Sequence, residues 1–257
     1  MSATSTRRAA TVSLGLSGLL LLTAAGSAVA QEEANGAGAP VVVGYDFEGD
    51  AQGWEPIIVD LPDGYDPEVG DLLTEWLPLP EGLEGHGLYG QGANQSDDLF
   101  IGWKARVDGL APATEYLVDA DLVMASNMPG EIADEPNSPA EVYVKVGAID
   151  REPEAIVDDE GWLRLNADKG REEEGGRNAV VLGTIANPNL ERGEDLRTFA
   201  LHELTTRDLG LTGSTDPDGT LWLFMGTDSG YAGFTTQFYD ALEVTLTPAD
   251  GGAVEGE

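Results

Sequence analysis

Seven polar residues stand at the ends of apolar runs, where side chains from different parts of a chain can meet. They are Asn94, Asp97, Asp98, Asn166, Asp168, Lys169 and Asp228. If carboxylates, amides and an amine gather in one cleft, they can bond the hydroxyl groups of a polar ligand. We predict such a ligand-binding cleft. It competes with ordinary turn and capping chemistry, the simpler interpretation and the one that the sequence favours.

Four aromatic residues in loop-like sequence are a second possible source of ligand contacts. They are Trp54, Tyr65, Trp76 and Tyr231. The C–H face of a sugar ring can pack on a flat aromatic ring while polar neighbours bond its hydroxyl groups. The alternative is that these side chains close the ends of the fold. Tyr231, close to Asp228, is included in the predicted ligand-binding set.

The signals for catalysis are weak. The chain has no cysteine, which excludes thiol catalysis, and its two histidines, His86 and His202, are isolated. Neither a G-x-S-x-G motif nor a His-rich metal spacing follows residue 30. A glycosidase needs two opposed carboxylates, and no pair stands out among the 47 acidic residues. We therefore predict a non-catalytic binding protein, with an extracellular polysaccharide hydrolase or a structural surface protein as alternatives.

The first 30 residues are typical of a secretory signal. Arg7 and Arg8 precede the apolar stretch TVSLGLSGLLLLTAA, and the small residues AVA end at Ala30. We expect cleavage near Ala30 and a location in the periplasm or the medium, by either the general or the twin-arginine export route. Residues 31–40 then form a flexible leader, 41–247 a single domain and 248–257 a disordered tail.

The chain is strongly acidic, with a formal net charge of −34 at pH 7. Such a charge repels nucleic acid, which excludes it as a partner, and it repels anionic membranes. The only long apolar run is the signal, which is too short to span a membrane. The acidity suits a saline exterior, where salt screens the repulsion, and some carboxylates could also hold Ca2+. We expect a monomer, with an extracellular glycan as the possible partner.

Alternation of apolar and polar residues recurs with a period of two, whereas helix-period stripes are nearly absent. The run EVYVKVGA, for example, predicts Val142, Val144 and Val146 inside and Lys145 outside. The runs AVVLGTI (179–185) and LWLFM (221–225) are apolar on both faces, as in central strands. Clusters of Gly, Pro and Asp separate these runs. The pattern predicts an all-β protein, an antiparallel β-sandwich with long loops.

The segment GLAPATEYLV (109–118) resembles a turn-plus-strand element of fibronectin type III domains and of carbohydrate-binding jelly rolls. Its Pro112 would set the turn, and Tyr116 would bond back to nearby backbone, as in a tyrosine corner. The chain is too long for one fibronectin module. The resemblance therefore favours the larger jelly roll.

The opening YDFEGDAQGW (45–54) and the closing FYDALEVTL (238–246) resemble the first and last strands of jelly-roll, galactose-binding-like carbohydrate-binding modules. The resemblance implies that the two strands lie near each other with a structural Ca2+ between them, at Glu48 and Asp240. In addition, the alternation places Asp240 on the face of Leu242, and a buried carboxylate needs a partner or a metal. The alternative is that both carboxylates face solvent. Asp46 and Asp50 are weaker candidates.

Most of the chain after the signal is also similar to a family of uncharacterised secreted bacterial proteins. The residues that carry this similarity are NQSDDLF (94–100), VYVKVGA, LRLNADKG (163–170), NAVVLGTIAN and LWLFMGTDSGYAG. The resemblance supports a single domain and implies no activity.

Overall fold

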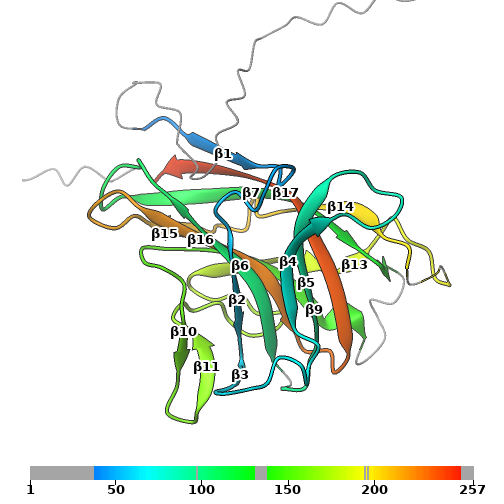
Figure 1. The fold of residues 1–257 in the computed structure, drawn as a ribbon. Coiled ribbons are helices and arrows are strands. Elements are labelled where there is room, and N and C mark those ends of the chain that lie inside the picture. Colours follow the sequence, from blue (N-terminus) through cyan, green and yellow to red (C-terminus); the bar gives the residue numbers. More distant parts are fainter. Residues whose placement is uncertain (1–37, 97, 131–137, 194, 196, 250–257) are drawn as a thin grey trace, which may run out of the picture.

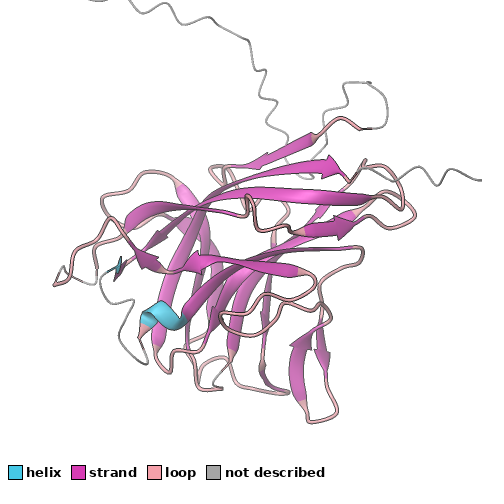
Figure 2. Cartoon of the chain, turned by 180° about the vertical axis from the view of Figure 1, so that it is seen from behind, coloured by secondary structure: helices cyan, strands magenta, loops and turns pink. Residues whose placement is uncertain are grey.

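The computed structural model describes residues 38–96, 98–130, 138–193, 195 and 197–249, and these form β-strands joined by long loops. Figure 2 shows this strand-and-loop architecture. None of the helical turns in these ranges is long and apolar enough to cross a membrane.

The larger sheet has seven strands. In spatial order they are β14 (Ala200–Thr205), β7 (Glu115–Ser126), β17 (Phe234–Pro248), β5 (His86–Ala93) and β4 (Leu73–Pro78), with β1 (Val41–Tyr45) on β17 and β15 (Thr212–Ser214) on β7. The first strand β1 runs antiparallel to the last strand β17, with Val41 opposite Leu246 and Tyr45 opposite Leu242. Figure 1 shows them side by side, β1 in blue and β17 in red. The proximity of the first and last strands is confirmed.

The second sheet has five strands. In spatial order they are β12 (Ala179–Thr184), β9 (Val142–Ile149), β16 (Leu221–Ser229), β6 (Leu99–Val107) and β2 (Glu55–Val59). The central place of LWLFM, in β16, is confirmed. AVVLGTI was predicted to be central as well, and this is wrong, because β12 lies at the sheet edge. Its apolar character has another cause: Val180 and Leu182 pack on the core, while Ala179 contacts a layer on the opposite face.

Two small sheets complete the fold. β10 (Ala155–Val157), β11 (Trp162–Leu165) and β3 (Leu61–Pro62) pair antiparallel, and the β10–β11 hairpin projects from the body in Figure 1. β8 (Met128–Pro129) and β13 (Ala186–Asn187) form a short parallel pair. All other pairings of the described strands are antiparallel, so the predicted antiparallel β-sandwich is confirmed.

The main core lies between the two large sheets. Val142, Val144 and Val146 of β9 contribute from one side, and Leu122 of β7 and Val244 of β17 from the other, all of them buried. The three valines are the residues that the alternation in EVYVKVGA predicts to face inward. The predicted tyrosine corner is also confirmed, because the backbone N–H of Ala111 donates to the Tyr116 hydroxyl over 2.9 Å.

A second apolar layer covers the outer face of the five-stranded sheet. Phe100 and Phe224 meet there edge to face at 6.5 Å, and Leu165 of β11 packs on them. Glycines make room for the rings: a Cβ on Gly147 would lie 2.1 Å from Phe224 Cζ, and one on Gly226 would lie 2.4 Å from Phe100 Cζ. The face is thereby closed off from solvent, which sets the environment of any charged group on it.

Candidate functional site

Three of the predicted polar residues do converge, on the outer face of the five-stranded sheet. Asp228 lies in β16, Asp98 just before β6, and Lys169 in the loop between β11 and β12. Lys169 Nζ lies 2.9 Å from both carboxylate oxygens of Asp228 and 3.9 Å from Asp98 Oδ1. Asp97, the predicted site residue next to Asp98, lies outside the described residues.

The structure adds three residues to this cluster that the sequence did not indicate: Lys145, Asp60 and Arg164. Lys145 Nζ lies 2.6 Å from Asp228 Oδ2, and both side chains have zero exposure. Arg164 donates to Asp60 Oδ1 over 2.8 Å, and Lys169 Nζ makes a charge contact of 2.9 Å with Asp60 Oδ2. We call these three residues, together with Asp98, Lys169 and Asp228, the charge cluster.

The position of Lys145 corrects the prediction that it faces outward into solvent. Its side chain does leave the sheet on the side opposite to the valines, but the loop around Lys169 and Glu174 covers that side. Lys145 donates to the carbonyl oxygens of both loop residues, over 3.1 and 2.9 Å. Alternation along one strand gives the face of a side chain, and it does not show that a distant loop buries that face.

Asp98 is the least tightly held carboxylate of the charge cluster. It lies 3.7 Å from Arg164, 3.8 Å from Arg171 and 3.9 Å from Lys169, all longer than a hydrogen bond, and its buried Oδ1 has no hydrogen-bond donor. Burial, opposed by Lys169 and reinforced by Asp60, raises the pKa of Asp98 to about 6. Its side chain keeps 16% exposure, so it forms the solvent edge of the cluster.

The carboxylates of Asp60, Asp98 and Asp228 have oxygens within 4.8 Å of one another, as a metal site would require. The ammonium groups of Lys145 and Lys169 already neutralise this space, however, so the arrangement is a network of ion pairs. It also lacks two accessible carboxylates for hydrolysis, because the side chains of Asp60 and Asp228 are only 5% and 0% exposed.

The side chains of the remaining predicted ligand-binding residues bond to backbone groups or pack against the core. Asn94 donates to the Ser229 carbonyl, Asn166 binds the backbone of Glu152, and Asp168 accepts from Gly170 in a turn. Tyr231 packs against the main core. The contact of Asp168 with Gly170, two positions away, matches the alternative of turn chemistry, whereas Asn94 and Ser229 are 135 positions apart. A role for these four residues in ligand binding stays a prediction.

The predicted calcium ligands, Glu48 and Asp240, lie close enough to interact. Burial, followed by the charge of Glu48, raises the pKa of Asp240. A Cβ on Gly85 would lie 2.2 Å from Glu48 Oε1, so the Glu48 carboxylate rests against the loop before β5. The alternation argument for Asp240 is wrong, because β17 has a bulge between Tyr239 and Ala241. Tyr239 is therefore fully buried, whereas Asp240 is only half-buried.

The weaker calcium candidates serve a turn. Asp46 accepts hydrogen bonds from the Glu48 backbone and the Gln52 side chain, and Asp50 accepts one from the Gln52 backbone. Of the four loop aromatics, Trp54 is buried in the main core, where it contacts Tyr45 edge to face. Trp76 stacks on His86, and the Tyr65 ring packs with Leu61. The alternative that these aromatics close the fold accounts for their positions.

Exposed apolar residues gather instead on the outer face of the seven-stranded sheet. Phe234 of β17 is 46% exposed and Leu73 of β4 is 37% exposed. Between them on the same face lie Gln91, paired with Leu73 and with Thr236, and Tyr89. We call Leu73, Tyr89, Gln91, Phe234 and Thr236 the β4–β5–β17 face.

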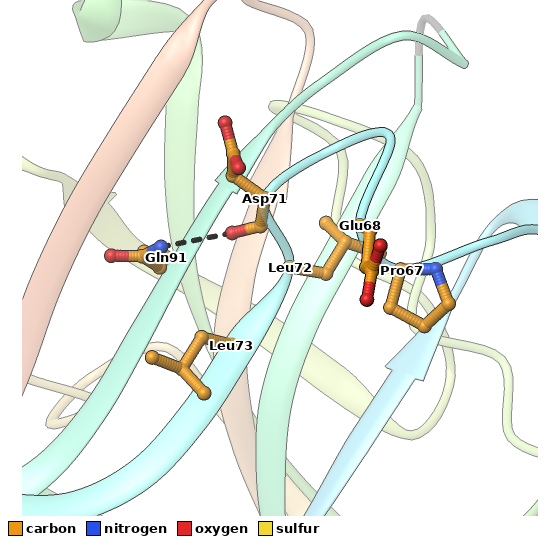
Figure 3. A pocket seen from close by; sticks show the side chains of 6 residues that line it. All are labelled: Pro67, Glu68, Asp71, Leu72, Leu73 and Gln91. Carbon is orange, nitrogen blue, oxygen red and sulfur yellow. Dashed lines mark hydrogen bonds between the residues drawn. The ribbon is translucent and has the colours of Figure 1, made fainter.

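The polar groups of the β4–β5–β17 face form a continuous chain. Thr236 donates to the Tyr89 hydroxyl over 3.0 Å, Tyr89 donates to Gln91 Oε1, and Gln91 Nε2 donates to the Asp71 carbonyl over 3.0 Å. Beside it lies a shallow depression of about 500 Å³ that is open to solvent. Figure 3 shows Gln91 and Leu73 at this depression with Pro67, Glu68, Asp71 and Leu72.

The sequence contained a signal for this face that the prediction missed. In FTTQF (234–238), Phe234 and Phe238 alternate with Thr236 on one side of the strand, while the other side is buried. In LYGQGA (88–93), Tyr89 and Gln91 alternate with buried glycines. This alternation places aromatic and amide side chains on the outer side of two paired strands.

No known family model matches the chain, and no curated protein is significantly similar to it. The similarity to a family of uncharacterised secreted proteins therefore stays a prediction. The solved structures that resemble the chain include the xylan-binding domain from Paenibacillus barcinonensis Xyn10C, at 12% identity and a TM-score of 0.36, covering 80% of this chain and 94% of that domain. A putative sugar binding protein from Bacteroides thetaiotaomicron matches at 12% identity and a TM-score of 0.38, covering 79% of this chain and 91% of that one.

The enzymatically active domain of the bacteriophage CBA120 tailspike protein 4 also resembles the chain, at 9% identity and a TM-score of 0.34. That match covers 77% of this chain and only 20% of the tailspike domain. Similarities at this level concern the general β-architecture. They carry no argument about what this chain binds, which has to come from its own residues.

Proposed function

We propose that the protein is an exported, non-catalytic binding protein that holds a glycan on the β4–β5–β17 face. The observation that carries the proposal is the combination of exposed Phe234 and Leu73 with the hydrogen-bonded chain of Thr236, Tyr89 and Gln91. Saccharide sites need both elements, since an apolar surface packs on the C–H face of the ring and fixed polar groups bond the hydroxyls.

The geometry of the face suits a long, neutral chain better than a small buried ligand. The depression beside Gln91 is open, and the contacts come from β17 and β5 inside the sheet and from β4 at its edge. The net charge of −34 repels acidic polysaccharides. We therefore propose a neutral or basic glycan, bound along the sheet surface by a monomer in the periplasm or the medium.

Affinity electrophoresis against neutral polysaccharides, xylan and β-1,4-galactan among them, tests this proposal. The wild-type protein should be retarded by at least one polymer, and Phe234→Ala and Gln91→Ala should each weaken the retardation constant about tenfold. The matched control is Ile156→Ala, which removes a side chain of 48% exposure from β10, away from the face. No retardation by any polymer, or equal loss in the control, would contradict the proposal.

We also propose that Glu48 and Asp240 hold a structural Ca2+ ion. Two carboxylates that repel each other, one of them half-buried, fit a divalent cation, which would offset both the repulsion and the burial. The ion would join the segment after β1 to the bulge of β17. This supports the paired terminal strands on which the sheet depends.

Thermal unfolding in excess CaCl2 and in EDTA tests the calcium proposal. Saturation at about a hundred times the Kd stabilises by about 2.7 kcal/mol, which raises the Tm by roughly 5–10 °C for a domain of this size. Glu48→Gln should abolish the difference, whereas Glu203→Gln, at an exposed position on β14, should keep it. Equal Tm values in CaCl2 and EDTA for the wild-type protein would remove the ion from the proposal.

A further inference from the structure

Lys145 and Asp228 form an ion pair in an unusual place. They come from the neighbouring strands β9 and β16, at the centre of the five-stranded sheet, and Nζ lies 2.6 Å from Oδ2. Both side chains have zero exposure, and the loop that covers Lys145 binds it through the carbonyl oxygens of Lys169 and Glu174. Two charges without water are held at a high cost in desolvation.

We propose that Lys145 and Asp228 are joined by an intramolecular isopeptide bond between Nζ of the lysine and Cγ of the aspartate. The bond replaces two buried charges by one neutral amide. It consumes nothing beyond the two side chains and releases one molecule of water. It would be a covalent modification of the fold, independent of the glycan site on the opposite sheet.

The reaction balances as a condensation. The ammonium of Lys145 passes one proton along its hydrogen bond to Asp228 Oδ2, which gives a neutral amine and a neutral carboxylic acid. The nitrogen lone pair then attacks Cγ, so the N–C bond forms. A second proton moves from nitrogen to the hydroxyl group, and the C–O bond breaks as water leaves. Exclusion of bulk water from the site favours the amide over hydrolysis.

Neighbouring groups are placed to assist each stage. Lys169 Nζ, 2.9 Å from Asp228 Oδ1, stabilises the negative charge that develops on that oxygen during attack, while the Glu172 backbone N–H, 3.0 Å from Oδ2, orients the carboxyl group. Asp98, whose oxygen lies within 4.8 Å of an Asp228 oxygen and whose buried Oδ1 has no donor, can relay the second proton.

The surroundings select Lys145 over Lys169 as the nucleophile. Burial lowers the pKa of Lys145 against the opposing charge of Asp228, which favours the free amine. For Lys169, burial acts in the same direction, but Asp228, Asp60 and Asp98 outweigh it and its pKa is raised. Lys169 also contacts both oxygens of Asp228 at equal distance, an arrangement that suits a charge partner.

Peptide mapping of the wild-type protein tests the bond directly. The full chain is digested with trypsin, which does not cleave after a lysine whose amine is acylated. The expected product is a branched peptide in which the segment with Lys145 is attached to the segment with Asp228, lighter by one water than the sum of the two. Recovery of two separate linear peptides, with normal cleavage after Lys145, would overturn the proposal.

Two further samples make the assignment specific. Lys145→Arg keeps the positive charge but cannot form the amide, so its branched peptide should vanish, whereas Lys104→Arg, whose lysine pairs with Glu152, should keep it. Loss of water at an Asp-Gly step such as Asp63–Gly64 stays within one linear peptide and is thereby distinguished.

The role of Asp98 is tested by a time course. In a time course that starts from newly synthesised chains, before the amide has formed, Asp98→Asn should accumulate the branched peptide more slowly than the wild-type protein, and its rate should lose the dependence on pH that a relay with a pKa of about 6 produces. A wild-type rate with an unchanged pH profile would remove Asp98 from the mechanism. The mapping of the wild-type chain decides on the bond itself, whatever the variants do.

Discussion

Replacing Asp60 by asparagine should destabilise the protein much more than the same replacement at a surface ion pair. Asp60 is 3% exposed and accepts from Arg164 over 2.8 Å, while Lys169 Nζ lies 2.9 Å away. Asparagine has nearly the same shape and tolerates the positive φ of 66° at this position, so the change removes charge with little strain. The comparison therefore isolates the electrostatics of a buried site.

The expected loss of stability depends on which partners Lys169 and Arg164 retain after the substitution. Breaking a buried pair typically costs about 3–5 kcal/mol. Here Lys169 keeps its hydrogen bond to Asp228 Oδ1 at 2.9 Å, as carboxylate or as amide, and Arg164 keeps Asp158 at 3.2 Å, which points to the lower end of the range. We expect a loss of about 3 kcal/mol in the free energy of unfolding, or roughly 6–12 °C in Tm.

The assay is urea unfolding at neutral pH, with Asp121→Asn as the matched control. Asp121 also pairs with an arginine, Arg207, but its side chain is 41% exposed, so its loss should cost less than about 1 kcal/mol. The m-values should be unchanged in both variants. Equal losses in the two variants would show that the charge cluster is not the low-dielectric site described above.

The same variant should change the titration of Asp98, because the charge of Asp60 contributes to its raised pKa of about 6. A folded-state pKa above the unfolded value of 3.8 means that the folded state binds the proton more tightly. The resulting stabilisation is complete below the unfolded pKa and is lost as the pH rises through about 6. In Asp60→Asn, carboxyl NMR should report a lower pKa for Asp98 than in the wild-type protein. Urea unfolding should show a smaller gain in stability on acidification.

Two further predictions concern packing and pH. Gly147→Ala should destabilise by about 1–3 kcal/mol in urea unfolding, because its Cβ would lie 2.1 Å from a Phe224 carbon and 2.5 Å from the Asn178 carbonyl oxygen. Gly44→Ala, with no atom within 4 Å, should be neutral, and equal effects would contradict the packing argument. Burial lowers the pKa of His202 from 6.5, so the unfolded state binds the His202 proton more tightly than the folded state does. The stability that depends on neutral His202 is therefore present above pH 6.5 and is lost as the pH falls toward the folded-state pKa. In His202→Leu the free energy of unfolding should no longer fall over this pH range. The same dependence on pH in the variant and the wild-type protein would refute the assignment to His202.

The sandwich was predictable because its two sheets enclose one core. In each strand, the alternation of apolar and polar residues shows which side chains face that core. The run EVYVKVGA placed Val142, Val144 and Val146 on one side, and all three are buried. Tyr116 could be assigned a bond to backbone because its partner, Ala111, is only five positions away. Both predictions depend only on residues that are close together in the sequence, so the geometry of one segment is enough to make them.

The charge cluster and the bulge at Asp240 were less accessible, because neither depends on one segment alone. The burial of Lys145 is caused by a loop more than twenty positions later, and the Asp60 contact by a chain segment over a hundred positions from Arg164. A single inserted residue in β17 shifts Tyr239 into the core, which alternation counted from Leu242 cannot show.

The two outer faces of the sandwich differ in a way that separates the proposals. On the five-stranded sheet, the loop around Lys169 and Glu174 seals the surface, so charged side chains interact with one another instead of with a ligand. On the seven-stranded sheet, no comparable described segment covers Phe234 and Leu73, which remain 46% and 37% exposed. If these positions served only to keep the protein soluble, carboxylates would be expected there. Apolar groups beside ordered amide and hydroxyl groups are better explained by contact with a partner that presents both kinds of surface, as a saccharide does.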